Sequence, residues 1–140
     1  MNAECFLDTN VFLYAFDRGA AAKRARAGEL IGDGLRSGCA VISWQVCQEF
    51  LHAALHKPTT AVPPQLLADY LSHVLAPMCR VMPSPALYGN ALRIHRETRF
   101  RFYDSLIVAA AIESGAPVLY SEDLQHDRWI GPLRIVDPFR

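Results

Sequence analysis

The sequence contains few lysines and no closely paired cysteines. Of its 14 basic residues only two are lysines, and 14 acidic residues balance them, so the formal net charge is zero. Net charge therefore gives no indication of a nucleic-acid partner. The four cysteines show neither a CxxC spacing nor a Cys/His ligand pattern. This spacing argues against a zinc module and a disulfide framework, and we expect reduced thiols that serve as small core residues.

Long apolar runs are also missing. No uninterrupted apolar stretch approaches the roughly 18 residues of a membrane span. The N-terminus lacks the basic region and apolar run that are typical of a signal peptide. We therefore expect a cytoplasmic protein without membrane association. With 140 residues, 51% of them hydrophobic, the chain is expected to form one globular domain over residues 1–140.

Short apolar segments alternate with helical patterns along the chain. The expected strands are 5–7, 39–42, 81–82, 118–120 and 135–136. The expected helices are 20–36, 44–57, 63–75, 85–97 and 103–114. Ser43 and Ser84 are suitable N-caps, Pro58 and Pro77 are expected to end helices, and Gly115 to cap one. No element is assigned to the apolar stretch 11–16. The alternation predicts an α/β fold, with a parallel sheet covered by helices on both faces.

Four acidic residues occupy positions where chemistry is often found. Asp8 directly follows the first expected strand and Asp123 follows the fourth. Ligands of open parallel sheets gather at the carboxyl ends of the strands. Asp104 begins an apolar helix, where the helix dipole favours a negative charge. Glu49 lies inside the helix after the second strand.

Several carboxylates in one place repel one another, and a divalent cation removes that repulsion. Mg²⁺ and Mn²⁺ prefer oxygen ligands. Such a site polarises a phosphodiester and activates an attacking water. Taken singly, each of the four acids also fits a turn, a cap or a solvated helix position. The sequence by itself does not show that they converge.

Five segments carry a family resemblance. They are Phe6-Leu7-Asp8-Thr9-Asn10-Val11, Gln48-Glu49-Phe50, Tyr103-Asp104-Ser105-Leu106-Ile107-Val108-Ala109-Ala110-Ala111, Leu119-Tyr120-Ser121-Glu122-Asp123-Leu124-Gln125-His126 and Ile135-Val136-Asp137-Pro138-Phe139. In this order and spacing they resemble PIN-domain proteins, in particular the VapC-type ribonuclease toxins of type II toxin–antitoxin systems. One departure is Asp127-Arg128, where the family often has glycine, which puts the shape of that loop in doubt.

The resemblance implies a three-layer α/β/α sandwich with a parallel five-stranded sheet of order 3-2-1-4-5. It implies Mg²⁺- or Mn²⁺-dependent cleavage of RNA, with Asp8 and Asp104 as direct metal ligands. Glu49 and Asp123 match the remaining acidic positions, and bind through water or hold a second ion. Thr9, Asn10, Ser43 and Ser121 are expected to orient the carboxylates or waters. The implied partners are a small antitoxin protein and a second copy of the chain.

An arginine-rich segment leads into Asp104. Its basic residues are Arg93, Arg96, Arg99 and Arg101. They suit flanking phosphates of an RNA substrate, although a solvated helix face with antitoxin contacts is an open alternative. Phe100, Phe102 and Tyr103 could stack on bases, but core packing is expected for at least two of the three.

Other interpretations remain open. A non-catalytic PIN-like module that binds RNA or protein is one alternative. A phosphatase with a nucleophilic Asp8 is another, but that chemistry usually wants a second acid two residues on, where this chain has Asn10. His52 and His56 lack the His-Glu-x-x-His order of a zinc site and are expected at the surface or packed. Glu122 is an alternate ligand expected to point away from Asp123, and His126 a candidate proton donor. Transfer, ribosomal and messenger RNA all remain candidate substrates.

Overall fold

The computed structural model describes residues 2–57 and 62–140, in which a central sheet has the strand order β3-β2-β1-β4-β6-β5. Its strands are β1 (Cys5–Leu7), β2 (Ala40–Ser43), β3 (Cys79–Val81), β4 (Val118–Tyr120), β5 (Arg128–Ile130) and β6 (Leu133–Val136). The strands from β3 to β6 in this order pair in parallel, and β5 pairs antiparallel with β6. The carboxyl ends of β1 and β4 are therefore neighbours, which places the residues after these strands side by side.

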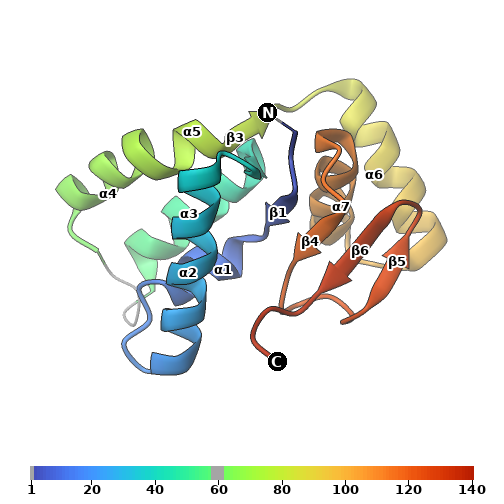
Figure 1. The fold of residues 1–140 in the computed structure, drawn as a ribbon. Coiled ribbons are helices and arrows are strands. Elements are labelled where there is room, and N and C mark those ends of the chain that lie inside the picture. Colours follow the sequence, from blue (N-terminus) through green and yellow to red (C-terminus); the bar gives the residue numbers. More distant parts are fainter. Residues whose placement is uncertain (1, 58–61) are drawn as a thin grey trace.

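Helices cover both faces of this sheet. They are α1 (Thr9–Tyr14), α2 (Ala21–Ser37), α3 (Trp44–His56), α4 (Pro64–Tyr70), α5 (Ala76–Met78), α6 (Pro85–Thr98) and α7 (Phe102–Ser114), with a π-helical turn at Leu71–Leu75 between α4 and α5. Figure 1 shows α6 and α7 on one side of the sheet and α1, α2 and α3 on the other. The fold is thus a three-layer α/β/α sandwich, as the resemblance implies. None of the helices in the described ranges is long and apolar enough to span a bilayer.

The core explains why α7 lies against the sheet. Residues 105–111 of this helix are all buried, and α7 contacts β1, β2, β3 and β4. A helix that is apolar on all sides belongs in the interior, because burial of apolar surface is the main force that drives folding. Gly115 ends α7 with a φ of 82°, the left-handed conformation that glycine adopts at low cost. The acidic first turn of α7 is thereby held at the carboxyl edge of the sheet.

The expected order 3-2-1-4-5 is confirmed, with β6 as its fifth strand, but the structure adds the edge strand β5. Asp127 precedes β5 with a φ of 64° and takes the conformation for which glycine is usual. Its carboxylate accepts a hydrogen bond from Arg134 Nε at 2.7 Å. Asp127, which replaces the family's glycine, therefore leads into the antiparallel pair of β5 and β6. Strand β5 was not predicted from the sequence because its three residues show no clear alternation of apolar and polar side chains.

Two further expectations were wrong or incomplete. The apolar stretch after Asp8 forms the short helix α1, which received no assignment because six residues are too few for a clear helical period. Pro77 does not end its helix, since the π-helical turn leads directly into α5, which contains Pro77. A wide turn of this kind accommodates a proline that an α-helical turn would reject. Pro58, which was expected to end α3, lies outside the described residues. Within them, α3 ends at His56.

Candidate active site

The four predicted acidic residues line one pocket of about 440 Å³ at the carboxyl edge of the sheet, together with Asp17. Asp8 follows β1, Glu49 projects from α3, Asp104 lies in the first turn of α7, and Asp123 follows β4. The structure therefore brings together all four acids that were singled out in the sequence. The polypeptide approaches this pocket from four separate segments, so the cluster depends on the tertiary fold.

Asp8 is the most deeply buried of the four, with 6% of its surface exposed. It is the N-cap of α1, and its Oδ1 accepts a hydrogen bond from the Thr9 backbone N–H at 2.7 Å. Its Oδ2 accepts one from Ser121 Oγ at the same distance. Burial raises the pKa of Asp8, the negative charges of Asp123 and Glu49 act in the same direction, and the two hydrogen bonds lower it. The net effect moves this pKa from 3.8 to about 7.

The first turn of α1 connects two of the other carboxylates. Thr9 Oγ1 donates to Glu49 Oε1 at 2.8 Å, and Asn10 Nδ2 donates to Asp123 Oδ2 at 3.0 Å. Ser121 Oγ, besides donating to Asp8, accepts from the Asp123 backbone N–H at 3.3 Å. Thr9, Asn10 and Ser121 therefore lie beside the carboxylates and fix their orientation, in the manner expected of residues that surround a metal site.

Asp104 is partly buried in the lining of the same pocket. Its partial burial raises the pKa of its carboxyl, and the charge of Asp123 acts in the same direction. Arg101, the N-cap of α7 three residues before Asp104, lowers this pKa. Like charges that share one site repel each other, and a cation between them relieves that repulsion. The pocket is therefore short of positive charge.

The remaining predicted residues lie outside the acidic pocket. Ser43 ends β2, one strand away from the β1–β4 edge, and lines a neighbouring groove. It occupies the N-cap position of α3, but among the described residues its side chain makes no capping hydrogen bond. The four arginines are all exposed, and Arg93 pairs with Glu97 at 3.4 Å. Arg101 is the one whose charge reaches Asp104.

The aromatic and histidine side chains that were considered in the sequence also have definite places. Phe100 and Phe102 pack against the core, as expected for two of the three aromatics, and Tyr103 is exposed. His52 and His56 are exposed on α3. The exposed His126 accepts a hydrogen bond from the Asp137 backbone N–H at 3.0 Å, which ties it to the C-terminal segment.

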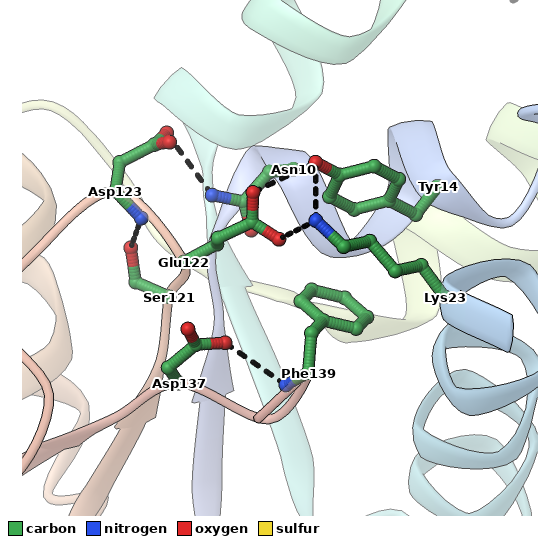
Figure 2. Close-up of polar contacts among 8 residues, drawn as sticks. All are labelled: Asn10, Tyr14, Lys23, Ser121, Glu122, Asp123, Asp137 and Phe139. Carbon is green, nitrogen blue, oxygen red and sulfur yellow. Dashed lines mark hydrogen bonds and ion pairs between the residues drawn. The ribbon is translucent and has the colours of Figure 1, made fainter. Parts of the chain in front are cut away.

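Glu122 points away from Asp123 and joins a separate network, which Figure 2 shows. Its carboxylate accepts hydrogen bonds from Tyr14 Oη and from Lys23 Nζ, both at 2.8 Å. The Lys23 ammonium lies 4.7 Å from the centre of the Tyr14 ring, and this ring packs edge-on against Phe139 at 4.9 Å. Although partial burial acts to raise it, these two donors hold the pKa of Glu122 below its usual range. The network links α1, α2 and the C-terminal segment to the loop that carries Asp123.

Sequence reasoning missed Tyr14 and Lys23 because nothing in the chain marks a contact that spans 99 residues. Asp17, which was not singled out as a site residue, accepts from the Gly19 backbone N–H at 2.9 Å and also lines the acidic pocket. Lys57 lines the same pocket. Glu49 and Ala53 lie on α3 and Lys57 is its C-cap, at intervals of four residues. This helical period could have indicated that they share a face.

Replacing Tyr14 with phenylalanine should lower the free energy of unfolding by about 1 kcal/mol. The change removes the hydroxyl that donates to Glu122 and keeps the ring that packs against Phe139. Urea denaturation measures the effect. Tyr88→Phe on α6, where the side chain is exposed, is the matched control and should change stability by much less. Equal losses in the two variants would contradict a stabilising role for the network.

The donor chemistry of the pocket fits a divalent cation that prefers oxygen. Besides the four carboxylates, Asn10 Oδ1 is buried there without a hydrogen-bond partner among the described residues. Such an orphaned oxygen is suited to a cation or to a water bound to it. In the described parts of the chain, no group of three or more His, Cys, Asp or Glu side chains is placed to hold an ion as it stands. Joint coordination therefore requires side chains to rotate into the pocket.

Comparisons with known proteins agree with this fold. A search of curated proteins finds no match to the sequence. One solved structure, described as a toxin–antitoxin complex from Klebsiella pneumoniae, is 17% identical, with a TM-score of 0.69 over 96% of this chain and 98% of that chain. A second, Mycobacterium tuberculosis VapC20, described as a toxin that cleaves the sarcin–ricin loop, is 18% identical, with a TM-score of 0.59 over 84% of this chain and 88% of that one. The PIN-domain family model matches residues 5–129. This match covers most of the chain, which therefore belongs to the PIN-domain family.

Proposed function

We propose that this chain is a Mg²⁺- or Mn²⁺-dependent endoribonuclease and the VapC-type toxin of a toxin–antitoxin pair. The observation that carries the proposal is the set of four carboxylates around one pocket, with Asp8 buried among like charges. Membership of the PIN-domain family supports it. The descriptions of the two structural neighbours, one from a toxin–antitoxin complex and the other a toxin that cleaves the sarcin–ricin loop, point to the same class of protein.

In this proposal Asp8 and Asp104 bind the cation directly, and Glu49 and Asp123 hold it through water or hold a second ion. The bound cation would polarise the phosphodiester and lower the pKa of the attacking water. The chain itself orients the ligands: Thr9 holds Glu49, and Asn10 holds Asp123. Ser121 keeps one oxygen of Asp8 in place. Ionised Asp8 is stabilised when positive charge enters the pocket, because its burial and its acidic neighbours both oppose ionisation.

Substrate binding falls to the exposed basic residues near the first turn of α7. The charge of Arg101 lowers the pKa of Asp104, so this arginine lies near the acidic pocket. We expect it to contact a phosphate next to the scissile one. Arg93, Arg96 and Arg99 are expected to contribute to binding more weakly. The other partners in this proposal are a small cognate antitoxin and a second copy of the chain, and the expected compartment is the cytoplasm.

The purified protein should cut single-stranded RNA in Mg²⁺ or Mn²⁺ and lose this activity when EDTA removes the ion. Gel analysis of ribosomal, transfer and messenger RNA measures the cutting and identifies the substrate class. Addition of Mn²⁺ in excess of the EDTA should restore activity, which separates loss of the ion from loss of the fold. Cutting that is equally fast in EDTA would contradict the proposal. Titration calorimetry without any binding of Mg²⁺ or Mn²⁺ would instead favour a non-catalytic PIN-like module.

A further inference from the structure

A second hollow, of about 420 Å³, lies next to the acidic pocket between α3, α6 and α7. We call it the aromatic groove, and it lies beyond the carboxyl ends of β2 and β3. Its lining includes Ser43, Trp44, Gln45, Tyr88, Phe102 and Tyr103. No charged side chain is among its described lining residues. The groove therefore suits a neutral group, in contrast to the acidic pocket.

Helix α3 separates the two hollows and shares residues with both. Gln45 and Gln48 line the aromatic groove, while Glu49 lines the acidic pocket. Gln45 Nε2 donates to Glu49 Oε2 at 3.3 Å and to the Tyr103 backbone carbonyl at 3.0 Å. Tyr103 in turn directly precedes Asp104. A ligand in the groove is thus separated from the carboxylates by a single side chain.

The groove offers planar aromatic surfaces that are open to solvent. Trp44 is 47% exposed, Tyr88 43% and Tyr103 65%. Aromatic side chains with exposed faces provide stacking surfaces for the bases of single-stranded nucleic acid. Exposed rings around one uncharged hollow therefore indicate a planar ligand.

Polar atoms without partners lie at the same place. Within the described residues, Ser43 Oγ and Gln45 Oε1 are buried and have no hydrogen-bond partner. Ser43 is only 2% exposed, and its side chain does not cap α3 there. An unpaired buried polar atom costs free energy, which a ligand with complementary donors and acceptors can offset. The hydroxyl can donate or accept, and the amide oxygen accepts.

We propose that the aromatic groove binds one base of a single-stranded RNA beside the phosphate that is cut. A base is neutral, planar and carries donors and acceptors on its edge, so it matches each of these features. A phosphate has no counter-charge in the groove, and a purely apolar partner would leave Ser43 and Gln45 unpaired. The inference rests on the proposed function, because it takes RNA as the substrate of the adjoining pocket.

The test measures RNA binding in EDTA, so that it does not depend on cleavage. The probes are fluorescently labelled hexaribonucleotides of A, C, G or U and an abasic hexamer that has the same backbone charge. Trp44→Ala and Tyr103→Ala should each raise the Kd for hexamers with bases about tenfold, by loss of stacking. Trp129→Ala is the matched control, since Trp129 is 62% exposed on the distant strand β5 and should leave the Kd unchanged.

Trp44 also serves as an intrinsic reporter. In a Trp129→Phe chain it is the single tryptophan. Its fluorescence should be quenched by hexamers with bases and unchanged by the abasic hexamer. Ser43→Ala, which removes the unpaired hydroxyl and keeps the aromatic surfaces, should change the ranking of the four hexamers, whereas Trp44→Ala should weaken all of them. An unchanged ranking would contradict the role of Ser43 as a reader of the base edge.

Two outcomes would overturn the inference. Unaltered Kd values in both aromatic variants, with normal thermal melts, would show that the groove binds no base. The second outcome is that Trp44 fluorescence changes with protein concentration in the absence of RNA, and that Trp44→Ala converts a dimer into a monomer in sedimentation. This result would show that a second copy of the chain occupies the groove. Metal-dependent cleavage by the wild type would still support the proposed function in either case, so the two failures are distinguishable.

Discussion

Replacing Asp8 with asparagine is expected to lower the rate of RNA cleavage by about a thousandfold, which corresponds to about 4 kcal/mol of transition-state stabilisation. The variant loses a negative charge at the centre of the acidic pocket and keeps the shape of the residue. The asparagine carbonyl can accept from the Thr9 backbone N–H, and its amide can donate to Ser121 Oγ. Single-turnover cleavage in Mn²⁺ measures the effect, with Asp69→Asn on the exposed face of α4 as the control.

The same variant should be more stable than the wild type above pH 7 in the absence of divalent ions. The folded protein holds the pKa of Asp8 at about 7, against 3.8 as its ordinary value. The neutral form of Asp8 therefore stabilises the fold fully below about pH 4, and this stability is lost as the pH rises through about 7. Asparagine is neutral throughout, so the gap should reach about 4 kcal/mol at alkaline pH and close at low pH.

Chemical denaturation of both proteins between pH 4 and 8 in EDTA measures this gap. Addition of Mn²⁺ at pH 8 should then raise the stability of the wild type and leave that of Asp8→Asn nearly unchanged, because ligands that bind the folded state alone stabilise it. A variant that cuts RNA as fast as the wild type would contradict the role of Asp8 in catalysis. A constant difference in stability across the pH range would contradict the shifted pKa.

Strand-end reasoning placed Asp8 and Asp123 correctly, because the sequence shows where a strand stops and parallel strands share their carboxyl edge. It placed Ser43 less well. Ser43 also ends a strand, but β2 lies one position away from the edge between β1 and β4, so its hydroxyl reaches the aromatic groove. A strand end thus predicts the edge of the sheet on which a residue lies. The position along that edge requires the strand order, which here came from the family resemblance.

Contacts between distant segments could not be predicted from the sequence for a different reason. Glu122 was recognised as pointing away from Asp123 from the alternation of an extended backbone. Its partners Tyr14 and Lys23 could not be foreseen, because helix packing brings them to the loop after β4. Likewise, Pro77 predicted a helix end from local sterics, and a π-helical turn overrides it. Local rules therefore predicted the elements, and packing determined which of their side chains meet.

Replacing Phe50 with alanine should lower the free energy of unfolding by about 3–5 kcal/mol. Phe50 is fully buried in α3 beside Glu49, and its ring lies 5.3 Å from that of Tyr70, 5.9 Å from Phe16 and 6.1 Å from Phe12, measured between ring centres. Removal of the ring leaves a cavity and ends three aromatic contacts at once. Because small domains have only about 5–15 kcal/mol of stability, this loss should leave the protein only marginally folded.

Urea denaturation of the variant measures the loss, with Leu55→Ala on the same helix as the control. Leu55 is 53% exposed, so its truncation should change stability by only about 0.5 kcal/mol. Phe50→Leu, which fills part of the cavity, should fall between the two and remain folded. In that variant, RNA cleavage at low temperature reports whether the aromatic contacts also position Glu49. A loss below about 1 kcal/mol in Phe50→Ala would show that this cluster does not anchor α3, and that the hydrogen bond from Thr9 to Glu49 holds this wall of the pocket instead.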